Sequence, residues 1–144
     1  MRLVILRVTL VVIAAFQILL GIAFLFAPSP FAASVGLAAT PGWVPWMFAM
    51  FSARALGFAY GSVLAMRDPY RHRSWITAMI GVQGIDWLAT MFFLAQGVVT
   101  LPQVSTAAFM PVVFIAGLVF TYPRRITTTA GNGAPQVGVP HVAS

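Results

Sequence analysis

Two residues of opposite charge stand alone inside long apolar stretches, and they are the strongest candidates for chemistry in this chain. Arg54 lies 13 residues before Arg67, and Asp86 lies 13 residues after Arg73. If both stretches are helical, the two side chains lie about 20 Å from the loop that joins them, because an α-helix rises about 1.5 Å per residue. An antiparallel helix hairpin would therefore bring them together.

Further polar residues are expected at a similar depth. Gln83, Asp86 and Thr90 are spaced i, i+3 and i+7, which places them on one face of a helix. Gln17 lies ten residues after Arg7 in the first apolar stretch, which gives it a similar depth. The sequence therefore predicts a buried polar cluster that consists of Gln17, Arg54, Gln83, Asp86 and Thr90.

The Arg54–Asp86 pair has several interpretations. Either charge alone would cost about 2.5–3.5 kcal/mol in the middle of a bilayer, so pairing removes most of that cost. A matched pair needs no further role, which favours a lock that fixes helix register. The two nearby glutamines favour a pocket for a polar or anionic ligand, or a proton path, because a lock does not require them. A contact to a partner subunit is the remaining interpretation.

Small residues mark the second apolar stretch. Arg54, Gly57 and Gly61 share one helical face, and Ala53, Gly57 and Gly61 recur every four residues. Such a ridge of small residues lets a neighbouring helix approach closely. We therefore expect Gly57 and Gly61 to serve helix packing.

The elements that position these residues follow from composition. The chain has 144 residues, of which 60% are hydrophobic and only 7% are charged, whereas a soluble domain carries about 25% charged residues. The sequence predicts an all-α fold, an integral membrane four-helix bundle over residues 1–125, followed by a flexible cytoplasmic tail over 126–144. The expected spans are 3–27, 43–66, 74–97 and 105–122.

The connections between these spans have their own signals. Residues 28–42 carry no charge and are expected to form an interfacial segment, with Ser29 and Pro30 starting a short helix over Phe31–Leu37. A second uncharged loop is expected over 98–104, with its turn at residues 101–103. Pro111 is expected to kink the last span, because its ring removes one helix hydrogen bond.

The remaining arginines set the orientation. All of them fall on one side of a four-span topology, and the two other loops carry no arginine or lysine. The positive-inside rule then places both termini and the central loop on the cytoplasmic side of a bacterial inner membrane. The residues expected to contact lipid headgroups or a partner are Arg67, Arg71, His72, Arg73, Arg124 and Arg125.

Several function classes are excluded by what the sequence lacks. It has no cysteine, which removes disulfide, iron–sulfur and thiol chemistry. Both histidines, His72 and His141, lie outside the apolar stretches, and Asp68 and Asp86 are the only carboxylate side chains, so no metal or cofactor site is expected. The net charge of +6 comes from arginines dispersed at span ends, so no nucleic-acid partner is expected.

Three segments resemble a known group. They are Ala53-Arg54-Ala55-Leu56-Gly57-Phe58-Ala59-Tyr60-Gly61, Arg67-Asp68-Pro69 and Gln83-Gly84-Ile85-Asp86-Trp87, together with Phe26-x-Pro28 at the end of the first span. Over residues 1–122 the chain resembles small uncharacterised bacterial four-helix membrane proteins that are DoxX-like in the broad sense. That resemblance implies a compact bundle that acts as a small subunit beside redox proteins or detoxification systems. It carries over no catalytic residues.

The sequence favours a non-catalytic accessory or anchor subunit of a larger inner-membrane complex, such as one that handles electrons or quinones through other chains. The alternative is a small-molecule or ion pathway at Arg54 and Asp86, in a homo-oligomer. A membrane enzyme that uses Asp86 as acid–base is disfavoured, because a carboxylate held by arginine stays ionised and donates protons poorly. Under each of these interpretations the protein is expected to contact the lipid bilayer.

Overall fold

The computed structural model describes residues 1–37 and 41–123, and every element in that part of the chain is a helix. This confirms the all-α prediction. Four of the helices are long and apolar enough to cross a membrane, and the tail predicted over 126–144 lies outside the described residues. The helices are α1 (Arg2–Phe26), α2 (Pro28–Ser34), α3 (Val44–Arg67), α4 (Arg73–Ala95) and α5 (Leu101–Thr121).

The last long helix begins earlier than the sequence predicts. It starts at Leu101 rather than at residue 105, because the Gln103 side chain accepts a hydrogen bond of 2.9 Å from the Thr100 backbone N–H and so caps the first turn. The predicted loop over 98–104 is correspondingly shorter. The backbone departs from helical angles at Val104 (φ −116°, ψ 17°), whereas the kink was expected at Pro111.

The short helix α2 also differs from its prediction over Phe31–Leu37. It begins at Pro28, where a missing backbone N–H costs nothing because the first helical N–H groups have no partner inside the helix. It ends before Gly36, whose φ of +78° reverses the chain and lets the Leu37 N–H bond the Ala32 carbonyl at 2.8 Å. The helix α2 therefore follows α1 directly and does not lie in the middle of the segment that joins α1 to α3.

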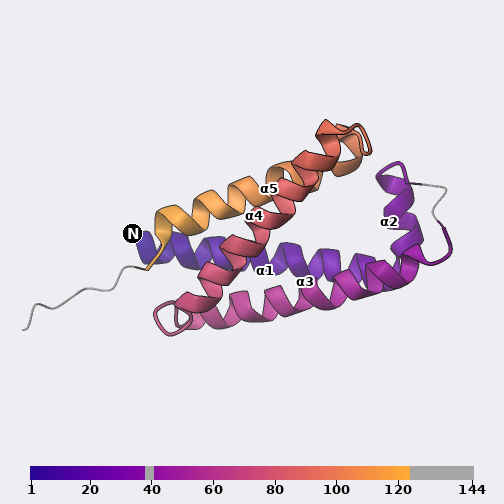
Figure 1. Ribbon diagram of the computed structural model, residues 1–144. Helices are drawn as coiled ribbons and strands as arrows, with labels where there is room; N and C mark the ends of the chain where they lie inside the picture. The colour runs from indigo at the N-terminus through magenta and orange to yellow at the C-terminus, as the bar shows by residue number, and fades with distance from the viewer. Residues whose placement is uncertain (38–40, 124–144) are drawn as a thin grey trace, which may run out of the picture.

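Two helix hairpins build the molecule (Figure 1). In the first, α1 and α3 run antiparallel side by side; the buried Ser52 hydroxyl of α3 donates to the Gly21 carbonyl of α1 at 2.8 Å. A Cβ atom on Gly21 would lie 2.9 Å from the Leu56 side chain and 3.5 Å from the Ser52 carbonyl oxygen, so α3 packs closely against α1 there. In the second hairpin, the Trp87 indole of α4 donates to the Ala108 carbonyl of α5 at 3.0 Å.

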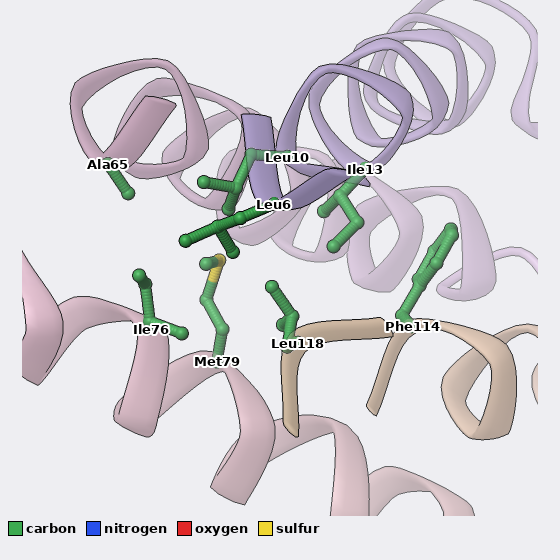
Figure 2. Close-up of a cluster of buried hydrophobic side chains, with 8 residues drawn as sticks. All are labelled: Leu6, Leu10, Ile13, Ala65, Ile76, Met79, Phe114 and Leu118. Atoms are coloured by element: carbon green, nitrogen blue, oxygen red, sulfur yellow. The ribbon is translucent and has the colours of Figure 1, made fainter. Parts of the chain in front are cut away.

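The two hairpins pack together mainly at one end of the molecule. We call it the basic end, because it holds Arg2, Arg7 and the α3–α4 loop; the neutral end holds α2 and the α4–α5 loop, which carry no charge. In Figure 1, α4 leaves the basic end and crosses obliquely, so that α4 and α5 diverge from α1 and α3 toward the neutral end. The buried core fills the basic half and draws side chains from all four long helices (Figure 2): Leu6, Leu10, Ile13, Ala65, Ile76, Met79, Phe114 and Leu118.

Candidate functional site

A cavity of about 530 Å³ lies between the two hairpins, beyond the packed core. Its wall includes residues from all five helices, and most of them are apolar or aromatic. The cavity reaches the neutral end, where Phe31, Val35 and Leu37 of the α2 region and Val99 of the α4–α5 loop line it. The sequence predicted a closed bundle interior at this depth, and the divergence of the hairpins replaces that interior with a cavity.

The structure brings Arg54 and Asp86 together in this cavity. The Nη2 group of Arg54 donates to Oδ2 of Asp86 in an ion pair, and the Arg54 guanidinium also lies 5.5 Å from the centre of the Phe58 ring. The two side chains are 38% and 43% exposed. The pair therefore faces the cavity, whereas the sequence placed it in a buried cluster.

The other members of the predicted cluster also line the cavity. Within the described residues, neither Gln17 nor Gln83 makes a side-chain hydrogen bond, so both amides keep their donors and acceptors free. The Thr90 hydroxyl donates to the backbone carbonyl of Asp86 at 2.8 Å, which leaves its oxygen able to accept.

Three of the polar residues on the cavity wall lie at one level of the molecule. Gln17, Arg54 and Asp86 each stand nine or ten residues from the end of their helix that lies at the neutral end. At a rise of about 1.5 Å per residue, each is about 14 Å from that end. Met110 of α5 lines the same cavity at the same level. A small molecule in the cavity can therefore meet all of these groups with one end.

Sequence reasoning missed the aromatic part of the wall. Phe24, Phe31 and Phe48 come from three different helices, and their ring centres lie 4.8–5.9 Å apart near the neutral end. No spacing rule within one helix links them, because each belongs to a separate element. Gln103 was also missed as a wall residue, because it was expected in a loop.

The two glycines predicted to serve packing behave differently. A Cβ atom on Gly61 would lie 1.8 Å from the ring of Trp75, so only glycine lets the start of α4 approach α3 there. The Trp75 ring also meets Phe58 edge-on, with 6.1 Å between ring centres. A Cβ atom on Gly57 would meet nothing within 4 Å. The predicted ridge of small residues thus has a packing partner at Gly61 and none at Gly57.

The basic loop contains several of the residues expected to contact lipid or a partner. Arg67 and Arg71 are exposed, and His72 is half-buried as the residue before α4. Asp68 turns the chain, because its Oδ1 accepts the backbone N–H of Arg71 at 3.1 Å. The remaining two members of that set, Arg124 and Arg125, lie outside the described residues.

Arg73 differs from the other arginines of this loop because it contacts its own chain. Its guanidinium lies 5.3 Å from the centre of the Tyr122 ring, and the Tyr122 and Thr77 hydroxyls are 2.8 Å apart in a hydrogen bond. These contacts tie the start of α4 to the end of α5. Arg73 therefore helps to hold the basic end together, and its contact with headgroups or a partner stays a prediction.

Residues 1–37 and 41–123 contain no group of three or more histidine, cysteine or carboxylate side chains placed to hold a metal ion. No family model, curated protein or solved structure matches the chain. The resemblance to DoxX-like proteins stays a prediction, and the functional interpretation rests on the geometry of the cavity.

Proposed function

We propose that this chain is a multi-pass membrane protein that binds a small amphipathic molecule from the bilayer in the cavity at Arg54 and Asp86. Its basic end faces the cytoplasm and its neutral end faces the opposite side, in agreement with the positive-inside rule. The location in a bilayer is supported by large apolar side chains that stay exposed on the long helices, such as Ile85 at 68% and Phe120 at 80%. Water-soluble monomers rarely expose apolar surface on that scale.

The observation that carries the proposal is the position of the ion pair on a cavity wall. A pair that only locks two helices is most effective when packing and hydrogen bonds surround it on all sides. Here Arg54 and Asp86 are both more than one-third exposed, and they face a space of about 530 Å³. Small-molecule sites have volumes of about 300–1,000 Å³, mostly apolar walls and a few convergent polar groups, and this cavity has all three properties.

The core limits what the cavity can do. Leu6, Leu10 and Leu118 are fully buried between the cavity and the basic end, so no continuous path crosses the part of the chain that the structure describes. Binding is therefore better supported than free passage of an ion. Transfer to the other side would require the two hairpins to separate at the basic end.

The role expected first from the sequence, an accessory or anchor subunit, stays a prediction. No contact among the described residues favours it over ligand binding. Catalysis by Asp86 also gains no support, because its carboxylate is ion-paired with Arg54.

Native mass spectrometry of protein released from its own membrane in a mild detergent tests the proposal. We expect a retained small molecule that is lost in Ala107→Trp, which fills the cavity wall, and kept in Val113→Trp, where the side chain is 60% exposed and outside that wall. Equal retention in the two variants, or no retained molecule in the wild type, would refute binding in the cavity. A stoichiometric larger protein in place of a small molecule would favour the accessory subunit.

A further inference from the structure

We infer that the molecule bound in this cavity carries an uncharged polar head group, with at least one hydrogen-bond donor and one acceptor, that binds at the Arg54–Asp86 pair. This inference rests on the proposed function, since it specifies the chemistry of the ligand for the same cavity. Three properties of the wall lead to it: the balance of charge, the free hydrogen-bonding groups, and the position of those groups relative to the aromatic rings.

The charges on the cavity wall already cancel. Among the residues that line the cavity, Arg54 and Asp86 are the only charged ones, and each is the ion-pair partner of the other. A charged head group would add a third charge without a counterion in a region of low dielectric, which is strongly unfavourable. An anion that displaced Asp86 from Arg54 would leave that carboxylate unpaired, and a cation that displaced Arg54 would leave the guanidinium unpaired.

The same wall keeps both donors and acceptors free. A guanidinium has five N–H donors, and one group of Arg54, Nη2, bonds Asp86. The carboxylate of Asp86 uses Oδ2 in that bond, so Oδ1 is free to accept a bond from a ligand. Gln17 and Gln83 each add an amide with donors and an acceptor. A head group that could only accept, or only donate, hydrogen bonds would leave either the acceptors or the donors of the wall without a partner.

Most of the apolar residues of the cavity wall lie on the neutral side of the polar level. The rings of Phe24, Phe31 and Phe48 cluster there, and both Phe24 and Phe31 line the cavity. A ligand that places its head at Arg54 and Asp86 therefore places its apolar body among these rings. The arrangement suits a compact amphiphile, such as an alkyl amide or a fatty alcohol, and it disfavours a hydrophilic metabolite.

Methionine methyl resonances in lipid nanodiscs provide the test. The protein carries seven methionines; Met110 lines the cavity at the level of the ion pair, and Met50 is 56% exposed outside the cavity wall. The probes share a ten-carbon chain and differ in the head group: decanamide, decyl sulfate and decyltrimethylammonium. Met50 reports partition into the bilayer, so a saturable shift at Met110 alone measures binding in the cavity.

We expect decanamide to saturate the Met110 shift with an affinity at least tenfold tighter than either charged probe. Asp86→Asn removes one charge of the pair and should reverse that preference toward decyl sulfate; the wild-type series does not depend on whether this variant folds. Equal or tighter binding of a charged probe to the wild type would overturn the inference and leave cavity binding standing. If no probe gives a saturable shift at Met110, both the inference and the proposed function are overturned.

Discussion

A methyl group added at Gly61 should loosen the end of the molecule where the two hairpins meet, whereas the same methyl at Gly57 should not. Both glycines lie in α3, one helical turn apart. A Cβ atom at Gly61 would lie 1.8 Å from Cε2 and 2.0 Å from Nε1 of Trp75, and nothing lies within 4 Å of one at Gly57. The indole is a rigid ring packed edge-on against Phe58, so it can make room only by moving as a unit.

The two substitutions share their effect on helix propensity, since alanine is favoured over glycine by up to about 1 kcal/mol in a helix interior. That gain cancels when the variants are compared with each other. Inserting a methylene into a well-packed site costs about 1–3 kcal/mol. We therefore expect Gly61→Ala to be about 1–3 kcal/mol less stable than Gly57→Ala, and Gly57→Ala to be as stable as the wild type or slightly more stable.

Unfolding by sodium dodecyl sulfate in mixed micelles, followed by tryptophan emission, measures the difference. A second pair of variants tests the cause: in a Trp75→Leu background the smaller side chain leaves room at residue 61, so Gly61→Ala should lose most of its penalty. Equal stability of Gly57→Ala and Gly61→Ala would refute the close approach of α4 to α3. An undiminished penalty without the indole would show that Trp75 is not the residue displaced.

Three further substitutions probe other contacts of the same fold. Either single change, Arg54→Asp or Asp86→Arg, should lower the stability by at most about 2.5–3.5 kcal/mol, and combining the two to exchange the charges should restore it in the same unfolding titration. Failure of the exchange would show that surrounding groups require one orientation of the pair. Ser52→Ala removes the hydroxyl that bonds a buried carbonyl of α1 and should cost about 1 kcal/mol, whereas an unchanged midpoint would mean that this bond contributes nothing. Leu118→Ala, in the core, should cost about 2 kcal/mol, near the low end for such changes because lipid also solvates the unfolded chain; the 54%-exposed Val119 provides the control, since Val119→Ala should cost far less.

Much of the fold could be predicted because it depends on one-dimensional signals. Apolar runs located the four long helices to within a few residues, and equal spacing from the basic loop predicted that Arg54 and Asp86 would meet. The tilt of α4 could not be predicted, because it depends on packing between residues far apart in the sequence. Gly61 lets Trp75 approach closely at the basic end, while large rings from α1, α2 and α3 line the cavity near the neutral end.

The same limit explains what was missed at the site. A helix pattern shows which residues share a face, and it placed Gln17 and Gln83 near the pair. It does not show whether the facing helices touch at that level, so a packed interior and a cavity have the same pattern. The two glycines of α3 illustrate this: Gly57 and Gly61 have the same spacing signal, and only Gly61 has a neighbour.

Thiol reactivity at two adjacent residues of α5 tests most directly whether the cavity is open to small polar molecules as far as the ion pair. The natural chain has no cysteine, so a single introduced thiol is the only one present. Met110 lines the cavity, and its neighbour Phe109 is 58% exposed outside the cavity wall. In vesicles with the neutral end outward, Met110→Cys should react with a small, uncharged, water-soluble reagent such as 2-hydroxyethyl methanethiosulfonate, and saturating decanamide should slow that reaction. Phe109→Cys should stay unmodified, because a thiol that faces lipid remains protonated and unreactive; equal reactivity of the two thiols, or none at residue 110, would contradict a cavity at Arg54 and Asp86.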